Sequence, residues 1–431
     1  TFFFYIALAR AVLTDMMFLM WITASLGFFF QSLEKTQSRG RNLLLGFAFM
    51  GGAVLTKGLL GLTFIMTAVV LYAVWIRQTD ILKDKYFWFG VGLFSLMVVP
   101  WHVLMYIQHG DFFIQEYFQN VHTRRLFEAE HPKLDNGFFY FILMLIGVFP
   151  WSMLWVPGVM LVIAQFKRQG KHLRALKYCI CWIISVLLYT QPATSKLASY
   201  IFPLFPAIAL IFGLTVDHLL EKSDGHDPRT FKWIGRLFPL FILAVCAAGI
   251  FIAKEHHEII YDMRPLYLGC FLFILTGIFI LTFHLKRQYV KMLFSFIGIH
   301  VALLISLFFM RPMIEPWVSC KAICDVFNTI DQSDAPIIAS KFYLRGVRYY
   351  TQRPVALIDV RGKGFWSPHP IPYLISDGTV KDFLKMRNIN YAIIKKGDSV
   401  ELKRILKGHP YKLEELAGIG GKYIYRITKT H

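Results

Sequence analysis

The chain has 431 residues, of which 56% are hydrophobic and 17% charged, and its mean hydropathy is +0.50. This composition excludes an ordinary soluble globular protein and predicts an integral membrane protein. The formal net charge of +19 could suggest a nucleic-acid partner. Much of that charge lies in loops between apolar segments, where membrane topology explains it. We therefore discount nucleic acid and expect membrane lipids as partners.

Apolar segments long enough to cross a hydrocarbon core of about 30 Å recur along the first 310 residues. Two shorter segments, at about 41–56 and 58–76, flank Lys57 and are predicted to form an antiparallel pair. The sequence thus predicts about ten spans in a multi-span α-helical membrane domain, residues 1–310. The longer segments lie at about 13–31, 86–106, 138–165, 177–191, 197–217, 233–253, 266–284 and 290–310.

Residues 311–431 are predicted to form a second domain, because helical and strand patterns alternate there. With 20 Lys/Arg against 11 Asp/Glu, this tail is basic, which suits a surface rich in anionic lipid headgroups. We expect a small α/β domain. Its predicted helices are 318–331, 341–350, 380–387 and 400–407, and its predicted strands are 336–340, 354–359, 391–395 and 422–428.

The basic residues of the short loops predict the orientation, because Lys and Arg near span ends are retained in the cytoplasm. The loops rich in these residues alternate with loops that are not. The loops without this excess of Lys and Arg include the Lys57 turn and the loop 107–136. The alternation therefore predicts that both of these loops face outward, together with the tail. The basic loops are 35–41, 77–85, 167–177, 222–232 and 286–291.

Arg10 and Asp15 are the first candidate functional residues. They lie five positions apart in ARAVLTD, at the predicted outer end of a span. An ionisable group stranded in hydrocarbon costs about 2.5–3.5 kcal/mol or more, so such groups are functional candidates. The alternative is a structural ion pair that joins two helices.

Lys57 follows in LTKGLLG, between the two short spans. It is predicted to precede a helix whose N-terminus points outward, where exposed amides and the helix dipole favour an anion. A loop lysine without function is the alternative reading.

The loop 107–136 carries the densest set of ionisable groups, including His122, Arg124 and Arg125 within ten residues of Glu128, Glu130 and His131. Arginine forks beside carboxylates and aromatic rings suit a phosphate site at the bilayer surface. An amphipathic interfacial helix with snorkelling basic residues remains open.

The turn SKLASY places a third group of polar residues at the predicted outer ends of the spans. Lys196 could contact a phosphate there, and Tyr200 a sugar or lipid headgroup. Both could equally be interfacial anchors, because tyrosine and lysine concentrate at membrane surfaces.

Five motifs in order carry a family resemblance: ARAVLTD, LTKGLLGL, PWHVL followed by EYFQNVHTRRLF, FFYFILMLIGVFPWS, and SKLASYIFPLFPAIAL. As a set they resemble the C-type membrane glycosyltransferases, in the bacterial branch. The likeness is greatest to the aminoarabinose transferases that modify lipid A from an undecaprenyl-phosphate donor, with the protein O-mannosyltransferases more distant. It covers about residues 1–310.

The resemblance implies a bacterial inner-membrane enzyme with thirteen spans and a periplasmic tail, so that three spans and an acidic residue regarded as catalytic are expected before Thr1. It implies a catalytic role for Asp15, a phosphate or metal contact for His122, a phosphate contact for Arg124 or Arg125, and a donor-site role for Tyr200. Lys57 and Lys196 are added from their positions alone. No cofactor is required by the sequence, and a divalent metal at His122 is possible.

The implied reaction moves a sugar from a polyprenyl phosphate to a lipid, such as a lipid A-like glycolipid, or to another acceptor. Cations would stabilise the phosphate that leaves. A transporter or flippase for a lipid-linked sugar is the alternative, because it too needs basic mouths. Transporters usually bind near the bilayer midplane, however, and here the ionisable residues cluster at one face. A scaffold without catalytic activity is a third reading.

Overall fold

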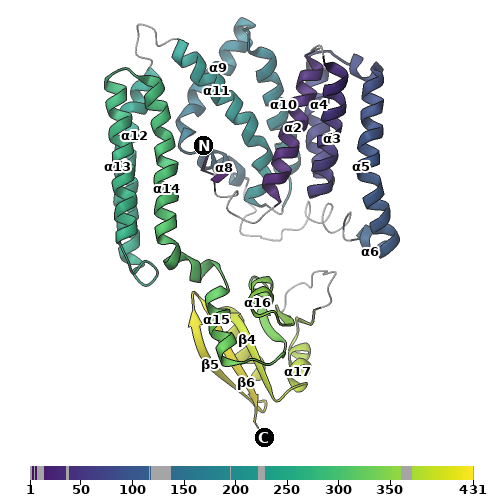
Figure 1. Ribbon diagram of the computed structural model, residues 1–431, viewed down its shortest axis with the longest axis vertical. Helices are drawn as coiled ribbons and strands as arrows, with labels where there is room; N and C mark the ends of the chain where they lie inside the picture. The colour runs from purple at the N-terminus through teal and green to yellow at the C-terminus, as the bar shows by residue number, and fades with distance from the viewer. Residues whose placement is uncertain are drawn as a thin grey trace. The chain divides into compact units, whose positions relative to one another are not determined.

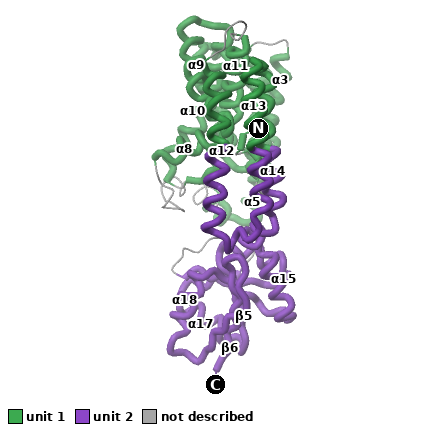
Figure 2. Tube along the Cα trace, turned by 90° about the vertical axis from the view of Figure 1, so that its left-hand side faces the viewer, with its two compact units in different colours: residues 1–242, 274–300 green, residues 243–273, 301–431 purple. Residues whose placement is uncertain are grey.

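The computed structural model describes residues 2–3, 5–6, 14–34, 38–115, 117, 137–194, 196–221, 229–360 and 371–430. The chain divides into two compact units, residues 1–242 with 274–300 and residues 243–273 with 301–431 (Figure 2). Three helices continue from one unit into the other: α12 (Arg229–Glu255), α13 (Arg264–Leu285) and α14 (Tyr289–Val318). The predicted domain boundary near residue 310 therefore falls inside the continuous helix α14.

Apart from these three helices, the first unit is built from the helices and 3-10 turns of the N-terminal half (Figure 1). They are α2 (Asp15–Leu33), α3 (Arg39–Lys57), α4 (Leu60–Trp75), η1 (Asp80–Lys83), α5 (Lys85–His109), α6 (Asp111–Ile114), α8 (Phe139–Gly147), η4 (Trp151–Leu154), α9 (Trp155–Arg168), α10 (Leu173–Thr190), η5 (Ala198–Leu204) and α11 (Phe205–Glu221).

The predicted multi-span α-helical fold is confirmed. Within the described ranges, seven helices are long and apolar enough to cross a membrane, and a bent pair would make an eighth. The prediction of about ten spans also counted α3 and α4. Both are helices, but neither is among the seven: α4 has 16 residues, and α3 includes Arg39, Arg41 and Lys57.

The segment predicted as one span at 138–165 is not a straight helix. It forms α8 and then η4 with α9, and the two parts are bent by 108°. Pro150 lies at the break, where it has no N–H to donate to the helix ladder. The apolar pattern predicted the helices correctly but could not show the angle between them.

Small residues let the N-terminal helices approach closely. α3 packs against α2, α4 and α5 (Figure 1). A Cβ on Gly90 of α5 would lie only 2.2 Å from the Phe47 ring of α3, and the hydroxyl of Ser25 in α2 donates to the carbonyl of Gly46 in α3 over 2.8 Å. Close packing and interhelical hydrogen bonds of this kind stabilise helices in membranes, where no hydrophobic force draws them together.

Replacing Gly61 with Ala is expected to destabilise the first unit, because the added Cβ would lie 2.8 Å from the carbonyl carbon of Ala53 and backbone cannot swing aside. Overpacking of this kind costs about 1–3 kcal/mol. Gly27→Ala is the matched control, since nothing lies within 4 Å of its added Cβ. The midpoint of thermal unfolding in detergent should fall for Gly61→Ala and stay level or rise for Gly27→Ala; equal midpoints would contradict the α3–α4 contact.

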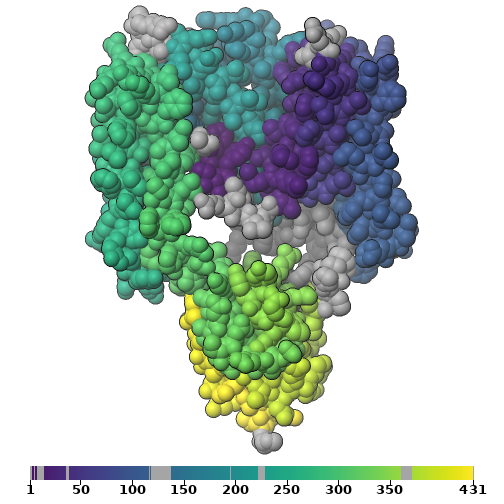
Figure 3. Space-filling view, viewed as in Figure 1, coloured from purple at the N-terminus to yellow at the C-terminus, as the bar shows by residue number. Residues whose placement is uncertain are grey.

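The tail folds around a six-stranded sheet of order β3-β2-β1-β4-β6-β5, which confirms the predicted small α/β domain. The first four strands are parallel, and β6 is antiparallel to β4 and β5. In the space-filling view the residues after α14, green to yellow, form a single lobe (Figure 3). Its elements are α15 (Lys321–Ile330), β1 (Ile337–Ser340), α16 (Leu344–Thr351), β2 (Val355–Ile358), β3 (Tyr373–Leu374), α17 (Asp377–Lys385), β4 (Ile389–Lys395), α18 (Lys396–Leu406), β5 (Tyr411–Ile419) and β6 (Lys422–Lys429).

Helices cover both faces of the sheet with separate cores. α17 and α18 contribute Phe383 and Leu402 to the core that includes Ile338. α15 and α16 contribute Phe327 and Val347 to the core on the other face. Each strand of the parallel part is therefore buried on both sides, as in doubly covered α/β sheets.

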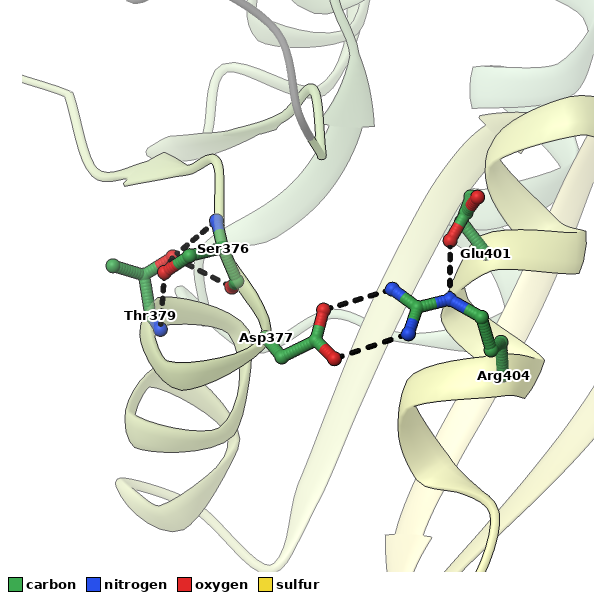
Figure 4. Close-up of polar contacts among 5 residues, drawn as sticks. All are labelled: Ser376, Asp377, Thr379, Glu401 and Arg404. Carbon is green, nitrogen blue, oxygen red and sulfur yellow. Dashed lines mark hydrogen bonds and ion pairs between the residues drawn. The ribbon is translucent and has the colours of Figure 1, made fainter.

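Polar contacts join α17 to α18. Ser376 caps α17 in a reciprocal capping box with Thr379, and Arg404 of α18 forms two bonds to Asp377, of 2.8 and 3.1 Å, beside a third to Glu401 (Figure 4). All of these groups are exposed, so they fix the ends of the helices rather than contribute much stability.

Lys422, the first residue of β6, is almost fully buried and receives the end of α14. Its ammonium donates to the carbonyls of Pro316, Trp317 and Gly420 at 2.8, 3.1 and 3.2 Å, and it lies 5.2 Å from the ring centroid of Tyr343. Burial lowers its pKa. Since a cation at a helix C-terminus stabilises the last carbonyls, Lys422 joins α14 to this end of the sheet.

Candidate functional site

Asp15 is the first residue of α2, where the positive end of the helix dipole stabilises a carboxylate. Its side chain is only 8% exposed. A buried carboxylate requires a partner, and the partner comes from another helix.

Lys57 is the last residue of α3. The sequence predicted that Lys57 precedes the outward N-terminus of a helix. Helix α4 does begin three residues later, but Lys57 itself ends α3. The negative end of the α3 dipole favours a cation at this position. Gly58 has a φ of +79°, which only glycine adopts readily, and it turns the chain toward α4. The LTKGLLG motif thus holds Lys57 at a tight helix-helix turn.

The ammonium of Lys57 donates to Oδ1 of Asp15, so two residues 42 positions apart form one ion pair. Two rings flank the ammonium, with centroids 5.5 Å away for Phe18 and 5.6 Å away for Tyr200. Tyr200 comes from η5, which packs against α2. Three of the predicted site residues, Asp15, Lys57 and Tyr200, therefore come together.

This arrangement can bind an anion beside a hydrogen-bond acceptor. The Lys57 side chain is 21% exposed, and the two rings add attraction for its cation. A phosphate on Lys57 would leave the Asp15 carboxylate beside it to accept a proton or a hydrogen bond from a hydroxyl.

Lys196 lies in the turn before η5 and is buried. Its ammonium donates to the carbonyl of Ala193 at 2.9 Å, within the same turn. The structure therefore gives Lys196 a local backbone partner, and its contact with a phosphate stays a prediction.

Four predicted residues, Arg10, His122, Arg124 and Arg125, lie outside the described residues. From their shared outward side we predict that His122 and Arg124 or Arg125 converge with Lys57 and Lys196 around one anionic site, and this stays a prediction. Within the ranges that are described, no three His, Cys, Asp or Glu side chains come together as metal ligands, and the possible metal at His122 is likewise untested.

His102 lies in the PWHVL motif but was not among the predicted site residues. Its Nδ1 lies 2.8 Å from the Val98 carbonyl, so it carries the proton that it donates there, and Nε2 accepts from the hydroxyl of Tyr117 at 3.0 Å. Trp101 and Phe113 pack against both rings. A histidine inside an apolar span was the signal available. The pair joins Tyr117 to α5.

An apolar cavity of about 330 Å³ lies next to η5. The ring of Tyr5, which lines it, is 4.8 Å from that of Phe202 in η5, the 3-10 turn that carries Tyr200. Cavities of this size and lining suit hydrocarbon. The lining residues are Phe2, Tyr5, Trp151, Leu154, Ala209, Phe212, Gly213 and Val216.

Comparison with known proteins gives a consistent family likeness. Residues 1–114, which include Asp15 and Lys57, match the family described as dolichyl-phosphate-mannose-protein mannosyltransferase. The undecaprenyl phosphate-α-4-amino-4-deoxy-L-arabinose arabinosyl transferases of Aeromonas salmonicida and Aeromonas hydrophila are both 27% identical, over 241 and 248 residues, which is 54% and 55% of this chain. The matches span 42% and 43% of those relatives, so less than half of their length.

The crystal structure of ArnT from Cupriavidus metallidurans bound to undecaprenyl phosphate has the same fold. The TM-score is 0.71 at 17% identity, over 96% of this chain and 74% of that one. The apo state of the same protein gives 0.70. The predicted resemblance to the bacterial C-type glycosyltransferases is thus confirmed in sequence over about half of the chain and in fold over nearly all of it.

Proposed function

We propose that the protein is a membrane glycosyltransferase that moves a sugar from a polyprenyl phosphate, such as undecaprenyl phosphate, to a lipid acceptor. The names of the relatives support this, since they are arabinosyl transferases with an undecaprenyl-phosphate donor. The structure with the same fold was solved with undecaprenyl phosphate bound. The chain's own residues supply the chemical reason.

The observation that carries the proposal is the pairing of Asp15 with Lys57 beneath the ring of Tyr200. A glycosyl transfer from a lipid phosphate releases that phosphate as the leaving group. Lys57 would stabilise its growing negative charge, and the groups are already positioned, so little reorganisation is needed.

Asp15 would act on the acceptor. A hydroxyl acceptor needs a base to take its proton, which a carboxylate held at a fixed position can do. An acceptor phosphate is already anionic near neutral pH, because its second pKa is about 6. In that case Asp15 would instead orient Lys57 and the donor sugar. The apolar cavity next to η5 would hold part of the prenyl chain.

We further propose that the acceptor is a lipid A-like glycolipid and that the site faces the periplasm of the bacterial inner membrane. The test is expression of the full-length protein in a Gram-negative strain that lacks its own lipid A glycosyltransferase but makes the lipid-linked aminosugar. Mass spectrometry should show lipid A heavier by one aminosugar, and resistance to cationic peptides should rise, since each lost charge pairing is worth roughly 1 kcal/mol. Unmodified lipid A from a folded, inserted protein would reject this acceptor.

The orientation gives a separate prediction. A reporter fused after His431 should be active if it functions only in the periplasm, because the basic loops are predicted to stay in the cytoplasm. A reporter that functions only in the cytoplasm should be silent at the same position. Activity of the cytoplasmic reporter would contradict the topology and the outward-facing site together.

The alternative function is transport of a lipid-linked sugar across the membrane. Asp15 begins one helix and Lys57 ends another. Charged groups at helix ends favour an enzyme at a membrane face, since transporters usually bind substrate near the midplane on broken helices.

A further inference from the structure

The tail contains a position at which open α/β sheets commonly bind ligands, and the proposed transfer reaction does not use it. The strand order places β1 beside β4, and their following segments lead to helices on opposite faces of the sheet, α16 with one core and α18 with the other. The sheet order reverses between these two strands. In open α/β sheets, ligands bind in the crevice that such a reversal leaves at the carboxyl ends of the strands.

That edge of the sheet lies on the side where α14 arrives. Lys395, the last residue of β4, pairs in register with Lys422, the first residue of β6. Lys422 holds the carbonyls of Pro316 and Trp317 at the end of α14. Since α14 is one of the helices long and apolar enough to span a membrane, the carboxyl edge is the edge of the sheet that contacts the end of a candidate membrane span.

Two lysine-carboxylate ion pairs lie at this edge of the sheet. The hydroxyl of Ser340, at the end of β1, donates to Asp398 at 2.5 Å and accepts from the backbone N–H of Lys395 at 3.0 Å. The ammonium of Lys395 lies 3.6 Å from Asp398, and that of Lys341 lies 3.6 Å from Asp359, just after β2. Long ion pairs whose lysines are about half exposed contribute little stability, so stability does not explain why two lysine-carboxylate pairs occupy this edge.

Two further side chains at the edge face solvent. Phe342, directly after Lys341, is 78% exposed, the greatest exposure of a Phe among the described residues. Lys396, the first residue of α18, is exposed and has no ion pair to a described residue. Lysines bind phosphate as point charges, carboxylates accept hydrogen bonds from hydroxyl groups, and an exposed aromatic ring offers an apolar face to a sugar ring.

We propose that this edge, Lys341, Phe342, Asp359, Lys395, Lys396 and Asp398, binds the phosphorylated sugar headgroup of a membrane glycolipid. The lysines contact the phosphate, the carboxylates contact sugar hydroxyls, and Phe342 covers the sugar ring. The choice of a glycolipid rests on the proposed function, whereas the site itself rests on the tail's geometry. The tail then gathers the acceptor at the membrane surface before transfer.

The test measures binding without any donor, so it does not depend on transfer. The full-length protein in detergent is titrated with lipid A, with dephosphorylated lipid A, and with phosphatidylglycerol, and the dissociation constants are measured by native mass spectrometry. Lys341→Gln/Lys396→Gln removes two charges at the edge. Lys412→Gln/Lys429→Gln is the matched control, because these exposed lysines lie at the opposite end of the sheet, where Tyr411 pairs with Lys429.

The edge variant should bind lipid A about 25-fold more weakly, since each lysine near a lipid surface contributes a factor of about five. The control variant should bind like the wild type, and the thermal midpoints of all three proteins should agree. Phe342→Ala should weaken binding of lipid A and leave phosphatidylglycerol unchanged. The proposal would be overturned if the edge and control variants weakened binding equally. It would also be overturned if the wild type bound lipid A no more tightly than phosphatidylglycerol, or no more tightly than dephosphorylated lipid A. Lost transfer with intact binding would instead count against the proposed function alone.

Discussion

Replacing Asp15 with Asn is expected to lower the rate of sugar transfer by about 10²- to 10⁴-fold, the range typical of a positioned acid or base. The side chain keeps its shape, but the carboxylate that pairs with Lys57 and could take a proton is gone. The rate should be measured at saturating donor and acceptor on purified full-length protein.

Asp217→Asn is the matched control, because this carboxylate in α11 is exposed and lies in a different helix from the ion pair. It should transfer sugar at the wild-type rate. Should the loss of transfer in Asp15→Asn follow a loss of folded protein, measured by size-exclusion elution and thermal midpoint, Asp15 has only a structural role.

Lys57→Met is expected to lower the turnover rate by about 10²- to 10³-fold, the cost of removing one group that stabilises transition-state charge. Methionine retains an apolar chain between the rings of Phe18 and Tyr200 but has no charge. Lys177→Met is the control: its ammonium also lies over an aromatic ring, 5.4 Å from the centroid of Trp75, at the other end of α4. It should leave turnover unchanged.

Exchanging the two charges separates catalysis from folding. The double variant Asp15→Lys/Lys57→Asp retains an ion pair between α2 and α3, so it should recover part of the stability lost in the single variants. Recovery should stay incomplete, because each charge then lies at the unfavourable end of its helix dipole. The double variant should not recover transfer, because the cation then stands in the wrong helix for the leaving phosphate. Recovery of transfer together with stability would show that the pair only joins the helices.

Much of the fold could be predicted from the sequence because apolar length and period dominate in membranes. Every predicted span is helical, and the tail's alternation predicted four of its six strands within about two residues at each end. Strand β5 was missed because YKLEELAGI contains strong helix formers, and pairing with β6 overrides that propensity. The 108° bend after α8 was missed because it depends on packing that a linear pattern does not contain.

The candidate site was predicted in part. Asp15, Lys57 and Tyr200 were each selected singly, as ionisable or aromatic residues at outer mouths, and the fold brings them together. That Asp15 pairs with Lys57 could not be foreseen, since Arg10 was nearer in sequence and the pairing depends on the contact between α2 and α3. His102 was missed because a single histidine in an apolar span was outweighed by the charged loop that follows.

Measuring sugar transfer in detergent tests the claim of glycosyltransferase activity most directly. A micelle has no second leaflet, so a transporter would produce no product there. The purified full-length protein is incubated with undecaprenyl-phosphate-linked aminoarabinose and lipid A, and both released undecaprenyl phosphate and modified lipid A are quantified. We predict equal amounts of the two products from the wild type and from the control Asp217→Asn, and almost none from Asp15→Asn or Lys57→Met. An intact donor after incubation with folded wild-type protein, or undiminished turnover in both site variants, would contradict the account.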